Sequence, residues 1–366
     1  MSAKRVDPLV QALLDEAAML PACAARDVLY QRAARQAEVL GDLDSAWESR
    51  CTVLESSSSH EAPRFETLFL CMAWCLKVSD RDPERFSPNR ILWQYKWVAV
   101  EAPRYASVPR RACERLIDDM EARYAKIGWG RRAAIHKRIE LHALLGEHEK
   151  AIALLPEWRA LARDRGADCL ACEADFLVSL LGAAGHSEHA VREARPIIRG
   201  KLSCATVPHS TFAALLNPLV RLGRVSEADD LFQRGRRLLK RMRSGGYRVA
   251  GEYMLHAARI GDVDASIQIA RGALPQAASE RADVTRFDWF SRLGTALAIL
   301  AGRGVGTVDL PKTALTPDGA DSDCRVLAER MLATARDHAR ALDLRNGNGY
   351  YESQLHQLAD DAKLGR

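Results

Sequence analysis

Two short segments of the sequence carry residue types that bind metal ions. "ADCLACEADF" holds Cys169 and Cys172 three positions apart, and "KLSCATVPHS" holds Cys204 and His209 five positions apart. Three thiolates and one imidazole suit tetrahedral zinc, with every coordination position on the protein and none open for catalysis. We therefore expect Cys169, Cys172, Cys204 and His209 to bind a structural zinc ion.

Two other interpretations of these cysteines stay open. They are small, half-buried residues at helix starts, or Cys169 and Cys172 form a thiol switch. The chain has nine cysteines, an odd number that does not indicate a disulfide framework. Cys71 and Cys75 lie four apart in an apolar stretch and are expected to be core residues.

A repeated phrase predicts the elements that position the two segments. A glycine is followed five residues later by a small residue in "LLGEHEKAIALL", "AAGHSEHAVREA", "RLGRVSEADDLF" and "RIGDVDASIQIA". These glycines, Gly146, Gly185, Gly223 and Gly261, are 39, 38 and 38 residues apart, and Gly41 begins the same phrase nearer the N-terminus. Such a glycine takes the left-handed position that ends the first helix of a helical hairpin.

The predicted fold class is all-α, a right-handed solenoid of helical hairpins of tetratricopeptide (TPR) type, because the apolar positions follow the period of a helix. An irregular helical bundle is the alternative, and no convincing strand is found. The expected parts are divergent N-terminal helical units in 1–128, regular repeats of about 38 residues in 129–301, a loop in 302–323, and a C-terminal capping helix and tail in 324–366. Tyr350 and Tyr351 are expected near a flexible terminus.

The repeat places the two cysteine segments at corresponding points of adjacent hairpins. The expected first helices of the regular hairpins are 130–145, 168–184, 208–222 and 246–260. Cys169 and Cys204 therefore fall near the starts of successive first helices, with Asp168 as a plausible N-cap of the earlier one. Zinc bound there would join two neighbouring hairpins at one edge.

Six short patches over about residues 60–350 resemble a group of large, mostly actinobacterial tetratricopeptide-repeat proteins. They are "SDRDPERF", "ILWQYKWV", "DCLAC", "KLSCATVPH", "LLNPLVRLGRVSEADDLFQRG" and "LDLRNG". This group is named by its repeats and has no assigned activity. The resemblance therefore implies the fold and says nothing about catalysis.

Composition limits the partners and the location of the protein. The net charge of +5 over 366 residues is small, so nucleic acid is not the expected partner. The densest basic run, "FQRGRRLLKRMRSGG", which includes Arg241 and Arg243, is expected to be a solvated helix face or an anion-binding patch. The N-terminus lacks the apolar core of a signal peptide, and no stretch is long enough to span a membrane, so a cytoplasmic location is expected.

The expected function is that of a non-enzymatic protein–protein interaction scaffold. The sequence contains no phosphate-binding loop with lysine, no H-E-x-x-H and no G-x-S-x-G. Stacked hairpins form a concave groove for a protein, peptide or helix, and groove arginines favour an acidic partner. The polar candidates for the groove are Arg131, Arg132, Lys137, Asn217, Arg221, Arg248 and Tyr253. The alternatives are a ligand- or thiol-responsive regulatory sensor, a nucleic-acid-binding protein, and an enzyme with residues from several helices.

Overall fold

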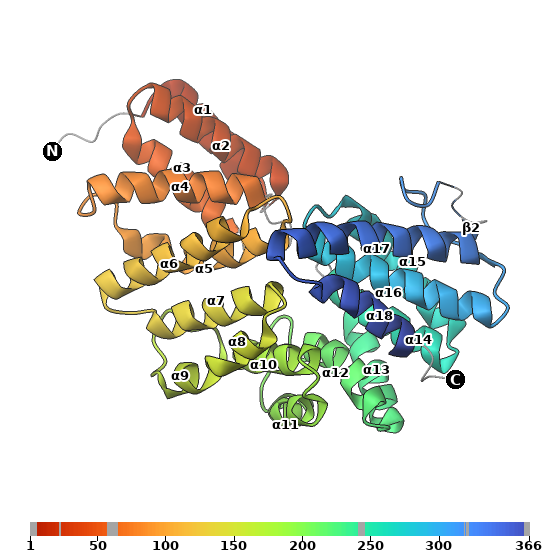
Figure 1. Ribbon diagram of the computed structural model, residues 1–366. Coiled ribbons are helices and arrows are strands. Elements are labelled where there is room, and N and C mark those ends of the chain that lie inside the picture. Colours follow the sequence, from red (N-terminus) through yellow and green to blue (C-terminus); the bar gives the residue numbers. More distant parts are fainter. Residues whose placement is uncertain are drawn as a thin grey trace. The chain divides into compact units, whose positions relative to one another are not determined.

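The computed structural model describes residues 6–21, 23–56, 65–240, 246–317, 319 and 322–361 (Figure 1). Helices make up nearly all of the regular structure in these residues, so the predicted all-α class is confirmed. The region 302–323, predicted as a loop, also holds two short antiparallel strands, β1 (Thr307–Val308) and β2 (Ser322–Asp323). The sequence prediction missed this pair because two residues are too few to show strand alternation.

The chain forms two compact units that interleave along the sequence. The first consists of Met1–Ala102, Ala112–Lys137 and Leu161–Gly166, and the second of Pro103–Arg111, Arg138–Ala160 and Ala167–Arg366. No helix in the described part of the chain combines the length and the apolar character needed to cross a membrane.

The first unit begins with helices that pack in chain order. Its elements are α1 (Pro8–Ala18), α2 (Ala24–Val39), α3 (Leu43–Glu55), α4 (Phe65–Arg81), η2 (Pro88–Arg90) and α5 (Leu92–Glu101), followed by most of α6 (Arg110–Ile127) and the start of α7 (Arg131–Leu144). The left-handed Gly41 joins α2 to α3, and Val10, Ala33 and Ala46 are fully buried between α1, α2 and α3. Cys71 and Cys75 of α4 are buried, as predicted.

The second unit contains the rest of α7 and the remaining helices (Figure 1). They are α8 (His148–Ala153), α9 (Leu155–Ala160), α10 (Leu170–Ala183), α11 (Ser187–Ile198), α12 (His209–Arg221), α13 (Val225–Leu239), α14 (Tyr247–Ile260), α15 (Val263–Ser279), α16 (Asp283–Gly302), α17 (Cys324–Asn346) and α18 (Tyr350–Asp361). Helix η3 (Ala102–Arg104) lies at the boundary of the units. Helices α10, α12 and α14 each pack on the helix that follows them and on the next even-numbered helix, and α16 packs on α17. Such nearest-neighbour packing is expected of a repeat array.

The glycine phrase marks the hairpin turns. Gly146, Gly185, Gly223 and Gly261 have φ of +76°, +82°, +71° and +83°, the left-handed conformation that favours glycine. Each lies between the first and second helix of a hairpin. The small residues that follow them are buried, which lets the two helices of each hairpin approach closely; these residues are Ala151, Ala190, Ala228 and Ser266.

The C-terminal region differs from the expected capping helix and tail. Helix α17 is the predicted cap and packs along α16, but a further helix, α18, follows it. Gly347 ends α17 in the left-handed conformation, and the Asp343 carboxylate then accepts hydrogen bonds from the Tyr351 and Glu352 amides, both at 2.9 Å. The sequence predicted the two tyrosines near a flexible terminus, whereas the structure places both in helix α18 with Tyr351 buried.

Candidate metal centre and candidate binding face

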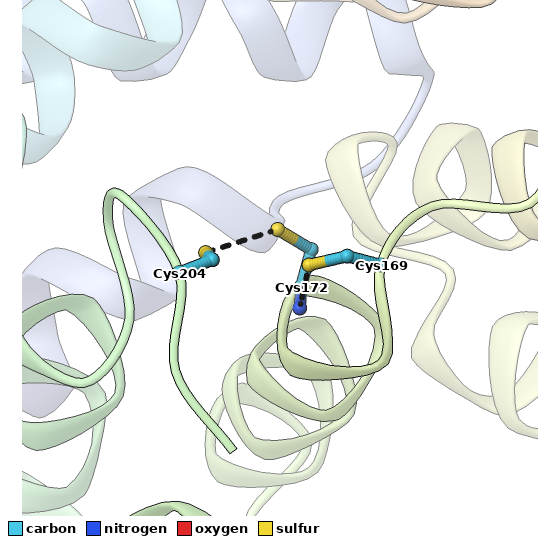
Figure 2. A group of neighbouring side chains, drawn as sticks. All are labelled: Cys169, Cys172 and Cys204. Atoms are coloured by element: carbon cyan, nitrogen blue, oxygen red, sulfur yellow. Dashed lines mark hydrogen bonds between the residues drawn. The ribbon is translucent and has the colours of Figure 1, made fainter.

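Three of the four predicted zinc ligands come together in the second unit (Figure 2). Cys169 precedes α10, Cys172 lies in its first turn, and Cys204 lies in the loop before α12. Their sulfur atoms all lie within 4.8 Å of one another, and the Cys172 and Cys204 sulfurs are 3.4 Å apart. Cys169 is exposed and the other two are half-buried, so the group lies at a surface edge of two adjacent hairpins.

Local hydrogen bonds position the three thiols. The N-cap of α10 is Cys169, and not Asp168 as predicted, because the Cys169 sulfur accepts the Cys172 amide at 3.3 Å. The Cys204 amide donates to the Val207 carbonyl at 3.0 Å and closes a turn that holds its sulfur toward Cys172. Corresponding loops of two hairpins thus meet, as the repeat register predicts.

The thiols differ in acidity. Burial, together with hydrogen bonds to the neighbouring Cys169 and Cys204 sulfurs, raises the pKa of Cys172 well above its ordinary value. Burial also acts to raise the pKa of Cys204, but hydrogen bonds at the backbone of Thr206 and Val207 and from the Cys172 thiol outweigh it and lower that pKa. Cys204 is therefore the better thiolate of this pair.

The three sulfurs fit the size of a thiolate metal site. Zinc–sulfur bonds of about 2.3 Å in a tetrahedron place neighbouring sulfurs about 3.8 Å apart. One observed separation, 3.4 Å between the Cys172 and Cys204 sulfurs, is close to that value, and all three sulfurs lie within 4.8 Å of one another. Soft sulfur donors favour zinc over hard cations such as magnesium.

His209 is not part of the group of ligand atoms around these sulfurs. It is the first residue of α12 and shares a helix face with the buried Phe212, Ala213 and Leu216 at helical spacing. The histidine is buried with this apolar face, and burial lowers the pKa of its imidazole. Its distance from Cys204 in the sequence suited a ligand, but the start of α12 fixes which way its side chain points.

The seven predicted groove residues divide between the two units. Arg131, Arg132 and Lys137 belong to the first unit, and Asn217, Arg221, Arg248 and Tyr253 to the second. Arg132 is buried and donates to the Leu161 carbonyl at 2.8 Å, while Lys137 is buried with its ammonium 4.5 Å from the centre of the Trp97 ring. Of the three residues in this unit, only Arg131 is exposed.

In the second unit, Tyr253 is a core residue and not a groove residue. It is fully buried, and its hydroxyl donates to the His209 carbonyl at 2.6 Å. A Cβ at Gly235 would lie 2.0 Å from this hydroxyl, so the glycine makes room for it. Arg248 is exposed and lies 3.8 Å from the Glu280 carboxylate.

Asn217 and Arg221 are half-buried members of a polar network. The Asn217 amide donates to Glu252 at 2.8 Å and accepts a hydrogen bond from Arg259. Arg259 is buried, and its Nε and Nη2 atoms have no partner. Arg221 instead forms a two-pronged pair with Asp361 at the end of α18, with Nη2 and Nε 2.6 and 3.1 Å from Oδ2.

Helix α18 is an element that the sequence prediction missed. Its first turn lies at the end of α7, where the Tyr351 hydroxyl donates to the Leu144 carbonyl at 2.8 Å. Its last residue, Asp361, pairs with Arg221 at the end of α12. The helical spacing of Tyr351, Leu355 and Leu358 was a signal for this helix, because it gives one apolar face.

Two of the four described cations of the predicted basic run form ion pairs. Arg234 lies 3.2 Å from Asp230, and Arg236 lies 3.1 Å from Asp262. Arg241 and Arg243 lie outside the described residues.

In comparisons with known proteins, no protein-family model and no curated protein matches the chain.

Proposed function

We propose that the chain is a non-enzymatic scaffold that holds a helix or peptide of a partner protein against its stacked, TPR-like hairpins. The binding face is formed by the ends of the first helices, where Arg221 and Asn217 lie. The expected partner is acidic, because a guanidinium group binds a carboxylate through two parallel hydrogen bonds.

The docking of α18 is the observation that carries this proposal. The chain holds a helix of its own at the ends of α7 and α12, with tyrosines at one end and the Arg221–Asp361 pair at the other. The side chains of this pair are only 23% and 10% exposed, so water weakens it less than it weakens a surface ion pair. A face that binds one acidic helix in this way has the chemistry to bind another.

A pocket beside α18 offers room for further contacts. It has a volume of about 600 Å³ and lies between the Gly185 turn, Arg221 and Gln357 of α18. His186, His189 and Arg192 also line it, with Glu188 the acidic residue among its lining groups. This predominance of basic groups again favours an acidic partner.

A peptide competition experiment tests the proposal. The probe is a fluorescent peptide with the sequence of residues 348–361, which stands in for the partner helix. In the full-length chain, Tyr351→Ala removes the hydroxyl and ring that hold α18, so the freed face is expected to bind the peptide at least tenfold more tightly than wild type. Fluorescence anisotropy measures this affinity, and circular dichroism confirms that the variant remains helical.

The matched controls distinguish peptide binding at a specific face from nonspecific binding by the variant. Adding Arg221→Ala to Tyr351→Ala should abolish the gain, whereas adding Arg224→Ala should keep it, because Arg224 pairs with Glu227 on the surface. The milder Asp361→Asn releases Arg221 without removing a tyrosine and should give a smaller gain. Absence of peptide binding to folded Tyr351→Ala and Asp361→Asn variants, or binding that ignores Arg221, would contradict the scaffold proposal.

The proposed cofactor is one zinc ion bound by Cys169, Cys172 and Cys204, with a structural role. The ion would join the start of α10 to the loop before α12 and so fix two neighbouring hairpins. Its binding to the folded chain would stabilise that chain by about 2.7 kcal/mol at a free zinc concentration one hundred times the Kd. Elemental analysis should find one zinc per chain, and a chelator should lower the melting temperature. Metal-free protein with unchanged melting would show the idea to be wrong.

A further inference from the structure

The group of sulfurs is one ligand short of the set that a closed zinc site needs. Structural zinc is almost always bound by four protein ligands in a tetrahedron. Among the described histidine, cysteine, aspartate and glutamate residues, only Cys169, Cys172 and Cys204 contribute a ligand atom to this group. The sequence had offered His209 as the fourth, and the structure places that residue elsewhere.

The position of His209 follows from the face of α12 on which it lies. Moving its ring to the sulfurs would rotate a buried position out of the face that also contains Phe212 and Leu216. Its own carbonyl is fixed by the Tyr253 hydroxyl at 2.6 Å, so the backbone at this point is held as well. A rearrangement that completed the site from within would therefore disturb the packing of α12.

Solvent reaches the sulfurs from the side of Cys169. This residue is exposed, whereas Cys172 and Cys204 are half-buried beneath the edge. The Thr206 hydroxyl is 3.8 Å from the Cys204 sulfur, and a neutral hydroxyl is a poor match for a soft ion.

The geometry points to a metal site with an open fourth position that takes an external thiolate. This inference rests on the zinc binding proposed above and names the further ligand of that site. Three thiolates from the chain and one from outside give the four-sulfur tetrahedron that zinc commonly adopts. The thiolate comes either from a small-molecule thiol or from a cysteine of a second copy of the chain. In both cases one sulfur–metal bond forms, a water leaves the ion, and the thiol proton passes to solvent.

Cobalt substitution with a thiol titration tests the open position. Co²⁺ replaces zinc in the full-length protein, and its visible absorption reports the number of bound thiolates. In monomeric protein, stepwise 2-mercaptoethanol is expected to shift a three-thiolate spectrum to that of a four-thiolate centre and to saturate at one thiol per cobalt. A dimer joined through its own cysteine should show the four-thiolate spectrum before any thiol is added. A three-thiolate spectrum that the thiol leaves unchanged would overturn the inference.

Variants identify the ligands and distinguish this inference from the zinc proposal. Cys204→Ser should lose stoichiometric cobalt binding, and the control Cys23→Ser, which changes a half-buried cysteine of the first unit, should retain it. His209→Ala should leave the spectrum and its thiol response unchanged, so a loss of either shows a closed site and contradicts the inference. Failure of wild type to bind cobalt or zinc removes the zinc proposal itself, whereas a three-thiolate centre that does not respond to the thiol removes only the open position.

Sedimentation of the zinc-loaded protein distinguishes the two sources of the thiolate. If a second copy supplies it, the loaded protein dimerises and 2-mercaptoethanol dissociates the dimer. If a small molecule supplies it, the loaded protein stays monomeric while the cobalt spectrum still responds to the thiol.

Discussion

The hairpins of the second unit have two edges. Both edges come from the same repeat, but different groups occupy them. We call them the turn edge, at Gly146, Gly185 and Gly223, and the start edge, at the three clustered cysteines. The 14 residues of α10 separate the two edges by about 20 Å. At the turn edge, helix α18 supplies partners for the ends of α7 and α12, whereas at the start edge three cysteine sulfurs lie together and are partly exposed.

This difference shows that the repeat alone does not determine which edge of the hairpins can bind a partner or a metal ion. The turn edge has binding chemistry, but the chain itself satisfies it, through contacts such as Asn348 to the Leu145 carbonyl, 203 residues away in sequence. A partner there has to compete with α18. The start edge requires no displacement, because a metal ion only has to replace thiol protons and water.

The largest expected effect is at the turn edge, where Gly146→Ala should destabilise the chain by about 3 kcal/mol. The left-handed φ costs about 1 kcal/mol for alanine, and overpacking costs about 1–3 kcal/mol more. The overpacking arises because the new Cβ would lie 2.4 Å from Cγ of Tyr350. Urea unfolding measures the change in the free energy of unfolding.

Gly223→Ala is the matched control for this prediction. Its φ is +71°, but nothing lies within 4 Å of the added Cβ, so only the backbone cost of about 1 kcal/mol is expected. If both variants lose the same free energy of unfolding, α18 does not pack on the Gly146 turn. The contrast between this turn and the Gly223 turn would then disappear.

A smaller effect is expected from Glu147→Gln, next to Gly146, which should lower the free energy of unfolding by about 2 kcal/mol at pH 6. Burial acts to raise the pKa of its carboxyl, but hydrogen bonds from Lys150, His142 and Arg110 outweigh it and lower this pKa from 4.5 to about 2. A lowered carboxylate pKa stabilises the fold fully above pH 4.5, and this stabilisation is lost as the pH falls toward 2. Wild type should therefore exceed Glu147→Gln in stability at pH 6, and the gap should narrow by pH 3.

The exposed Glu149 two positions later provides the control for that pH series. Glu149→Gln should track wild type at both pH values in urea unfolding. A constant gap between wild type and Glu147→Gln from pH 6 to pH 3 would mean that packing, and not charge, makes Glu147 stabilising.

Local features of the fold were predictable from the sequence. The four turn glycines, the helices that precede them and the meeting of Cys172 with Cys204 all follow from helix period and chain connectivity over about 40 residues. No glycine phrase occurs between residues 56 and 128, yet the helical units predicted for 1–128 continue there as α4 and α5, whose apolar content is high.

Features that depend on helix rotation or on distant segments were not predictable. His209 and Tyr253 lie on faces of α12 and α14 whose direction is set by packing with neighbours: His209 lies outside the group of sulfurs, and Tyr253 is fully buried. The docking of α18 depends on contacts between residues more than 130 positions apart, such as Arg221 and Asp361. A single sequence carries no record of such a contact.

The last prediction has the smallest effect on stability and tests the accessibility of the start edge. Under native conditions iodoacetamide should modify Cys169 at least tenfold faster than Cys71 of the first unit, because Cys169 is exposed while burial raises the pKa of Cys71 to about 11. Zinc should slow the reaction at Cys169 and leave Cys71 unaffected, as peptide mass spectrometry will show. Equal rates at the two cysteines would mean that the start edge is closed, and the proposed external thiolate would then have no route to the metal.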